Sequence, residues 1–106
     1  MNFIVGFVDL IIVKKNNLYL EGWCFNKTTK KIPLYFKIIY QKKILKKKLI
    51  RFKRFDVAKN LKENSNIKFG FKIMILSKIN IKNFSLSKLK FFVVHKNYKV
   101  RLPLSK

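Results

Sequence analysis

The stretch IKFGFKIMIL, residues Ile67–Leu76, decides the fold class of this chain. Every second residue from Phe69 to Ile75 is aromatic or β-branched, whereas Lys68 and Lys72 have the opposite parity. Successive side chains of an extended strand point to opposite faces, so this period of two predicts a strand with one buried and one solvated face.

Six further short runs share this β-branched and aromatic character, and turns rich in Lys and Asn separate them. Asn adopts the left-handed backbone conformation that tight turns need, which favours hairpins between these runs. The predicted strands are Phe3–Val13, Leu18–Phe25, Ile32–Tyr40, Ile44–Phe55, Ile67–Leu76, Leu89–His95 and Tyr98–Leu104. About seven short strands predict an all-β, antiparallel sandwich that forms one domain over residues 1–106, with a small barrel as the alternative.

Three segments depart from this simple alternation. Residues 56–64 predict one short helix, because the Asp56 carboxylate can accept from backbone N–H groups of a first turn. Lys46–Lys48 put charge on both faces of the fourth run, which predicts an edge strand, since lysine there opposes pairing with another chain. The looser segment Ser77–Lys88 predicts a short strand at Ile79–Ile81.

The charge of the chain is strongly unbalanced. Only four of the 106 residues are acidic, against 26 Lys and Arg, and the formal net charge is +22. A codon bias toward A/T accounts for the preference for Lys over Arg, but it leaves the missing acids unexplained, because Asp and Glu codons suit the same bias. The shortage of carboxylates therefore predicts an anionic partner, either nucleic acid, an anionic membrane surface or an acidic macromolecule.

The sequence offers little material for catalysis or for cofactor binding. Cys24 is the only thiol and His95 the only imidazole, so a Cys–His nucleophilic pair is formally available, without an orienting carboxylate in the pattern. No cluster of residues has the spacing of metal ligands, and there is no glycine-rich phosphate loop. The sequence predicts a protein that is not an enzyme and that uses no catalytic residue, cofactor or metal.

The longest apolar run and the single cysteine indicate the cellular compartment of the protein. The run Phe3–Val13 is too short, and with Asp9 too charged, to span a bilayer. It also lacks the basic start and the small-residue cleavage site of a signal peptide. A lone cysteine forms no intramolecular disulfide. We predict a cytoplasmic protein, with a peripheral position at the inner membrane left open.

Gly22 and Gly70, two of the three glycines, sit inside predicted strands beside aromatic residues. Gly22 precedes Trp23, and glycine within a strand marks a bulge or a close approach of another segment. Trp23 is expected to bury its ring in the sandwich, and a sugar-stacking platform is the alternative. Gly70 precedes Phe71, which continues the inward stripe, so a second close approach is expected there.

Three of the four acids lie within reach of one arginine in the predicted fold. Arg54 and Asp56 are two residues apart, which places them on one face of an extended backbone. Arg54 could equally pair with Asp9 or Glu21. We expect a partly buried network that fixes a corner of the sandwich, with a functional site as the alternative.

In this order and spacing, the motifs resemble a family of small immunoglobulin-like β-sandwich modules found beside glycosyltransferase domains in bacterial surface-polysaccharide enzymes. The resemblance covers about residues Phe3–Ile75, although family members are usually far less basic. It implies an accessory module without catalytic residues, whose partner is a glycan or a glycosyltransferase. The structural motif set comprises Gly6, Asp9, Glu21, Gly22, Trp23, Arg54, Asp56, Val57, Gly70 and Phe71.

The densest basic run is the candidate anion-binding segment of the sequence. Its members are Lys42, Lys43, Lys46, Lys47, Lys48, Arg51 and Lys53. Lysines act as point charges that give affinity for phosphates or anionic headgroups without sequence specificity. A solvated edge strand is the alternative explanation of the same run.

The sequence supports three hypotheses about function. The first is a non-catalytic accessory or binding module of glycan or surface-polysaccharide biosynthesis, which engages a saccharide or a partner enzyme. The alternative is a basic protein that binds RNA or the ribosome through a lysine-rich surface. An enzyme is the third, and the acids that look committed to turns and ion pairs oppose it. The sequence does not indicate an oligomeric state.

Overall fold

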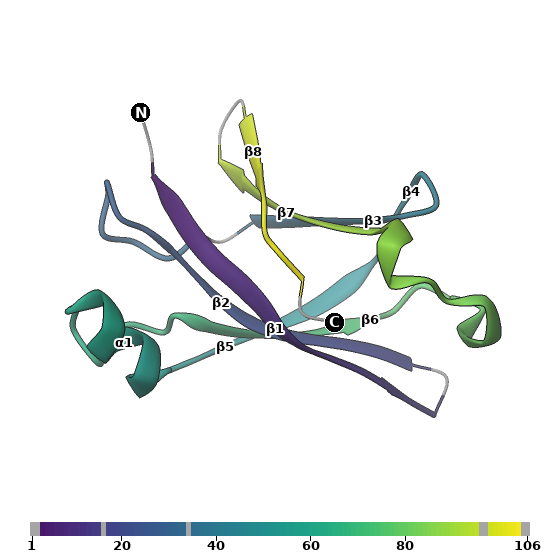
Figure 1. Ribbon diagram of the computed structural model, residues 1–106, viewed down its shortest axis with the longest axis horizontal. Coiled ribbons are helices and arrows are strands. Elements are labelled where there is room, and N and C mark those ends of the chain that lie inside the picture. The colour runs from purple at the N-terminus through teal and green to yellow at the C-terminus, as the bar shows by residue number, and fades with distance from the viewer. Residues whose placement is uncertain (1–2, 16, 34, 96–97, 105–106) are drawn as a thin grey trace.

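The computed structural model of the chain describes residues 3–15, 17–33, 35–95 and 98–104, and it contains two antiparallel four-stranded sheets packed face to face (Figure 1). Sheet A has the strand order β1-β2-β6-β5 and sheet B the order β4-β3-β7-β8. The strands are β1 (Ile4–Lys14), β2 (Asn17–Asn26), β3 (Tyr35–Tyr40), β4 (Lys43–Ile44), β5 (Lys47–Phe52), β6 (Gly70–Ile75), β7 (Leu89–His95) and β8 (Tyr98–Arg101).

This strand order confirms the predicted all-β, immunoglobulin-like sandwich. Immunoglobulin sandwiches place the first, second and two later strands in one sheet and the remaining strands in the other, with the same alternation along the chain. Here the chain crosses from sheet A to sheet B after β2, returns after β4 and crosses again after β6. Two separate sheets exclude the small barrel.

The predicted strand Ile44–Phe55 is wrong in one respect, because it is two strands in different sheets. Leu45 donates its backbone N–H to Ile38 in sheet B, and its side chain is buried. Lys46, the next residue, accepts from the backbone N–H of Leu76, which directly follows β6 of sheet A. The chain therefore changes sheets here, and β5 takes the predicted edge position.

Three phenylalanines from both sheets meet at the centre of the sandwich. Phe71 of β6 stacks on Phe91 of β7, with 5.2 Å between the ring centroids. Phe36 of β3 lies 5.1 Å from the Phe71 ring and 5.4 Å from the Phe91 ring. All three side chains are buried, which confirms the inward stripe predicted for the stretch around Phe71.

The segment between β6 and β7 is irregular, and the predicted strand at Ile79–Ile81 is wrong. The chain forms two 3-10 turns there, η1 (Ile81–Asn83) and η2 (Leu86–Lys88). Asn80 stabilises the first turn, because its Oδ1 accepts from the backbone N–H of Lys82 at 3.2 Å. Local bonding of this kind competes with a sheet ladder for the same backbone groups.

The last strand ends earlier than predicted, at Arg101 rather than Leu104. Pro103 has no N–H to donate to a ladder, so the pairing cannot continue through it. The Pro103 carbonyl instead accepts from the N–H of Val8 at 2.9 Å, and Leu104 forms an isolated bridge with Val8. The end of the chain thus passes from sheet B to the edge of β1.

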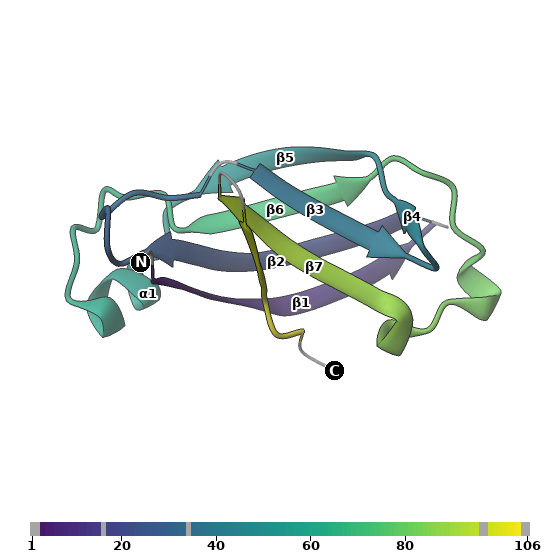
Figure 2. The same ribbon diagram turned by 90° about the horizontal axis from the view of Figure 1, so that it is seen from above.

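A short helix, α1 (Phe55–Leu61), covers one end of sheet A (Figures 1 and 2). Val57 and Ala58 of its buried face pack on Phe25 and Phe69, with Trp23 at the margin of this second cluster. The Trp23 ring is half-buried there, so its predicted place inside the sandwich is wrong. No helix formed by the described residues is long and apolar enough to cross a membrane.

Candidate functional site

Arg54 joins two carboxylates at the corner where β5 leads into α1. Its Nε and Nη2 donate to the two oxygens of Asp56 at 3.0 and 2.8 Å, and its Nη1 donates to Asp9 at 3.0 Å. These bonds raise the pKa of Arg54 and hold the pKa of Asp56 at about 2. Arg54 is the N-cap residue of α1, and Asp56 lies in its first turn, so the prediction of an Asp56 cap is wrong.

The Asp9 carboxylate reaches Arg54 because β1 is bulged at that residue. The register with β2 shifts between Val8 and Leu10, which leaves Asp9 as the extra residue. Glu21 is the third predicted partner, and the ion pairs of Arg54 among the described residues do not include it. Glu21 instead lies opposite Lys72 on β6. The predicted network is confirmed for Asp9 and Asp56 only.

Two of the three glycines of the motif set, Gly22 and Gly70, make room for neighbouring groups, as predicted. A Cβ atom on Gly22 would lie 2.2 Å from the Phe7 carbonyl oxygen and 2.8 Å from the Phe71 ring. A Cβ atom on Gly70 would lie 2.7 Å from the Phe52 ring and 2.8 Å from Cγ of Arg54. Gly22 therefore admits the central phenylalanine, and Gly70 admits the arginine of the ion-pair network.

Cys24 is buried in the core, and burial raises the pKa of its thiol to about 11. Thiolate is the nucleophilic form, so a thiol with such a pKa is unreactive at neutral pH. The His95 side chain, the other half of the formal nucleophilic pair, lies outside the described part of the structure. Among the described residues, no group of three or more His, Cys, Asp or Glu could hold a metal ion.

Arg51 of the candidate basic run points into the protein. Its Nη2 donates to the carbonyls of Lys68 and Phe69 at 3.0 and 3.3 Å, and its Nη1 lies 3.7 Å from the Cys24 sulfur. Its guanidinium also lies 5.7 Å from the centroid of the Phe36 ring in the opposite sheet. Arg51 thus closes the side of the sandwich, and it is not placed to bind an external anion.

The rest of the basic run is spread over both sheets. Lys42 and Lys43 belong to the β3–β4 hairpin of sheet B. Lys46 lies in the crossover, and Lys47 and Lys48 lie on β5, where burial lowers the pKa of Lys47. Lys53 follows β5, and its Nζ lies 3.4 Å from Oδ1 of Asn66. The structure therefore does not gather the predicted anion-binding segment on one surface.

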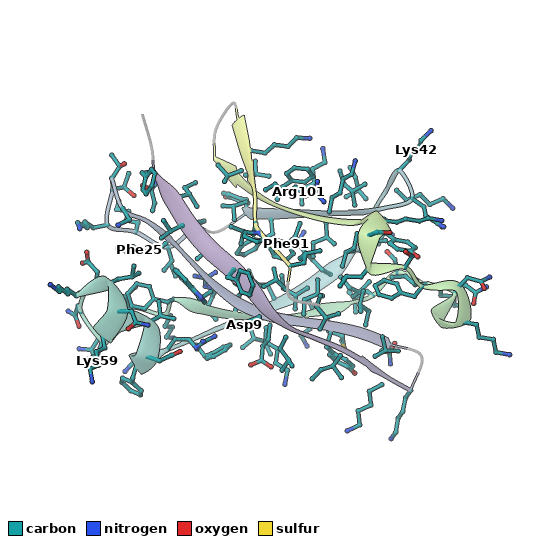
Figure 3. The ribbon with its side chains drawn as sticks, in the orientation of Figure 1. Asp9, Phe25, Lys42, Lys59, Phe91 and Arg101 are labelled. Carbon is teal, nitrogen blue, oxygen red and sulfur yellow. The ribbon has the colours of Figure 1, made fainter. Side chains whose placement is uncertain are left out.

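The four acids lie in sheet A or in and after α1, whereas basic residues lie on the strands of both sheets. Asp9 and Glu21 lie on strands of sheet A, Asp56 lies in α1, and Glu63 follows α1. Every charged residue in the strands of sheet B is basic. Figure 3 shows the buried Phe91 between the sheets, with Lys42 and Arg101 on the sheet B side and Asp9 on the sheet A side.

The outward-facing residues of sheet B form the candidate site, which we call the basic face. Cross-strand pairing places Lys37 and Arg101 on either side of Phe92, and Lys90 beside Ile39. Its members on the three strands are Tyr35, Lys37, Ile39, Lys90, Phe92, Val94, Lys99 and Arg101. Figure 2 looks onto this side of the molecule, where no helix lies over β3 and β7.

Aromatic rings lie among these positive charges. Tyr35 is 72% exposed, which is unusual for a tyrosine on a paired strand and leaves its ring available to a ligand. Phe92 is half-buried, and the Lys99 ammonium lies 4.5 Å from its ring centroid in a cation–π contact. None of the ion pairs among the described residues involves a lysine of this face.

A depression of about 510 Å³ lies at the border of the basic face. Four lysines from four different elements line it, together with Phe92: Lys42 of the hairpin turn, Lys88 of η2, Lys90 of β7 and Lys99 of β8. Of these, the candidate run contained Lys42 alone. Lys37, Lys90, Lys99 and Arg101 each stand between apolar or aromatic residues in the sequence, and this alternation is the signal that could have located the face.

Comparisons with models of known families, with curated proteins and with solved structures found no match to this chain.

Proposed function

We propose that this chain is a non-catalytic accessory module of bacterial glycan or surface-polysaccharide biosynthesis, which engages a saccharide or a partner enzyme through the basic face. One observation carries the proposal. The sandwich keeps all its acids away from sheet B, whose open face combines basic side chains with an exposed Tyr35. The resemblance of the motif series to glycosyltransferase-associated modules supplies the biological setting.

A non-catalytic role is supported by what the reactive groups do. Asp9 and Asp56 are ion-paired with Arg54, and Glu63 is ion-paired with Lys30 at 2.6 Å. General acid–base catalysis needs a titrating group in a cleft, within reach of a substrate proton. The Cys24 thiol is buried and protonated at neutral pH.

A saccharide ligand is supported by the partly aromatic character of the basic face. The Tyr35 ring offers an exposed apolar surface, and its hydroxyl can donate or accept a hydrogen bond. The lysines around Phe92 would attract an acidic saccharide more strongly than a neutral one. The face therefore favours an anionic glycan as the saccharide ligand.

Binding of single-stranded nucleic acid is the second candidate function, and the same face favours it. Proteins that bind single strands combine a positively charged track with aromatic rings on which bases stack. Tyr35 lies opposite Val94, and Phe92 is the next outward residue along β7. These two rings are diagonal neighbours on adjacent strands, which is close enough for one strand of nucleic acid to contact both.

Titration with three probes tests these candidates: an acidic hyaluronan oligosaccharide, a neutral malto-oligosaccharide and a single-stranded RNA oligomer. Amide chemical-shift mapping should place the acidic saccharide on β3, β7 and β8, with weak binding of the neutral one. The variant Lys90→Gln/Lys99→Gln should lose about 25-fold in affinity, since a lysine near an anionic surface contributes ~1 kcal/mol, or roughly fivefold. The matched control Lys48→Gln/Lys72→Gln, on the outer face of sheet A, has the same net charge and should bind like the parent.

Equal losses in the two double variants would show that net charge, and not the basic face, drives binding. RNA affinity with a log–log salt slope of roughly −0.7 per neutralised phosphate, mapped to the same strands, would support the second candidate. A glycosyltransferase domain that binds the parent but not Lys90→Gln/Lys99→Gln would support a partner enzyme. If none of these probes binds the protein, both candidate functions are contradicted.

A further inference from the structure

An apolar groove lies directly beside the basic depression. It forms where the end of the chain leaves sheet B, because the Pro103 carbonyl binds the N–H of Val8 and draws this segment toward β1. The 3-10 turn η2 lies on its other side and leads into β7. The groove has a volume of about 650 Å³, within the range of small-molecule sites.

The lining of the groove is almost entirely hydrocarbon. Leu89 and Leu102 are buried residues of the main core, and Leu86 and Leu104 are half-buried beside them. Arg101 is the charged residue among those that line it. Most of the groove therefore suits an apolar chain, and one cation stands at its border.

Shared residues and strand pairing join the groove to the basic depression. Ser87 of η2 lines both. Arg101, which lines the groove, lies opposite Phe92, which lines the depression. Lys88 and Leu89 are consecutive in the chain, and one lines each hollow. The apolar groove and the basic depression are thus two ends of one surface, which we call the composite site.

We propose that the composite site binds an amphiphile with a phosphate headgroup and a single hydrocarbon chain. This inference rests on the proposed binding function and names the ligand class of the basic face. The hydrocarbon chain lies in the apolar groove, where it is removed from water. The phosphate lies at the ammonium groups of Lys88, Lys90 and Lys99, which have no carboxylate among the described ion pairs.

The combination of the two hollows favours this ligand over a simple polyanion. A polyanion uses the lysines and leaves the leucine groove in water, whereas a neutral hydrocarbon leaves the four lysines unpaired. Lysine suits a phosphate because its ammonium is a compact point charge that approaches from any direction. A saccharide attached to the same phosphate could extend over the basic face toward Tyr35.

Titration of the full chain with dodecyl phosphate, below its critical micelle concentration, tests the proposal. Dodecyl maltoside has the same hydrocarbon chain with an uncharged head, and inorganic phosphate has the head without the chain. Dodecyl phosphate should bind at least tenfold more tightly than either, with amide shifts both at Leu86–Leu89 and at Lys99–Leu104. Phosphatidylglycerol vesicles then show whether a bilayer supplies the same ligand.

Two variants separate the ends of the composite site. Lys88→Gln/Lys90→Gln/Lys99→Gln should lose about 100-fold in affinity for dodecyl phosphate, because each lysine contributes roughly fivefold, and should keep its affinity for dodecyl maltoside. Leu86→Asn, at a half-buried position, should weaken both amphiphiles and leave inorganic phosphate unaffected. Lys14→Gln/Lys48→Gln/Lys72→Gln, which removes three lysines from strands of sheet A, is the charge control, and unchanged circular dichroism confirms that each variant is folded.

Equal affinity of dodecyl phosphate and inorganic phosphate would overturn the proposal, because the groove would then play no part. The proposal would also be overturned if the charge control lost as much affinity as Lys88→Gln/Lys90→Gln/Lys99→Gln. If dodecyl phosphate fails while an acidic oligosaccharide binds the basic face, the ligand class is wrong and the proposed function stands. If RNA alone binds at these residues, the proposed ligand is wrong and the second candidate function is supported.

Discussion

The guanidinium of Arg54 binds Asp9 at 3.0 Å, although 45 positions separate the two residues in the sequence. The contact connects the first strand of sheet A with the segment that follows its opposite edge strand. It is possible because Gly70 has no side chain beneath the arginine and because the bulge at Asp9 places an extra residue in β1. This ion pair thus depends on a glycine in β6 and on a bulge in β1.

The two carboxylates that bind Arg54 should differ in their contribution to stability. Asp9→Asn should lower the free energy of unfolding by about 1.5 kcal/mol, the lower end of the range for hydrogen bonds to charged groups, because both side chains are only partly buried. Asp56→Asn should cost less than about 1 kcal/mol, since the Asp56 side chain is 61% exposed. Urea denaturation measures both values. A larger loss of stability for Asp56→Asn would show that the Arg54–Asp56 bond contributes more to stability than the Arg54–Asp9 bond.

Acid should weaken this corner in a defined pH range. Arg54 lowers the pKa of Asp56 to about 2 from an ordinary value of 3.8, so the folded state favours the ionised carboxylate. The stability that this supplies is present above about pH 4 and is lost as the pH falls through about 2. Carboxyl carbon shifts should give a midpoint for Asp56 near pH 2 in the parent protein. A midpoint near 4 would contradict the bidentate contact, and Arg54→Met should produce that value.

Alanine at Gly22 and alanine at Gly70 should have unequal effects. Gly22→Ala places a methyl group 2.2 Å from the backbone oxygen of Phe7, which cannot move without breaking the β1–β2 ladder. We expect a loss of about 3 kcal/mol or more, at the upper end for overpacking. Gly70→Ala meets the Phe52 ring and Arg54 instead, and side chains can yield, so about 1–2 kcal/mol is expected. Thermal denaturation compares them, and equal losses would be inconsistent with these contacts.

One substitution should make the protein more stable. Lys62 ends α1 in the left-handed conformation, with φ 55° and ψ 45°, where a side chain costs roughly 1 kcal/mol. Lys62→Gly should remove that cost and raise the free energy of unfolding by about 0.5–1 kcal/mol. Lys59→Gly, which also removes one lysine but lies inside the helix, should lower it by about 1 kcal/mol. Destabilisation by Lys62→Gly would disprove the left-handed cap.

The strands themselves were determined by the sequence. Alternation is a local property, so the inward stripe of Phe71 and its neighbours could be read from residues two apart, and Leu89–His95 is a strand with the predicted bounds. Local signals were insufficient where a change of sheet was required. The Ile44–Phe55 run has no glycine or proline to mark the crossover at Leu45, and only the competition between two sheets divides it.

The partners of the charged residues were decided by the tertiary structure. Arg54 had three carboxylates available in the sequence, and in the structure it pairs with Asp9 and Asp56, whereas Glu21 lies opposite Lys72. The dense basic run is contiguous in the sequence. In the structure its side chains point to alternate faces, a change of sheet separates its two halves, and Arg51 points inward. The basic face gathers Lys37, Lys90, Lys99 and Arg101 from three strands, because pairing brings distant residues side by side. The sequence by itself determined that positive charge would dominate the surface, and the strand order decided on which face that charge has no carboxylate beside it.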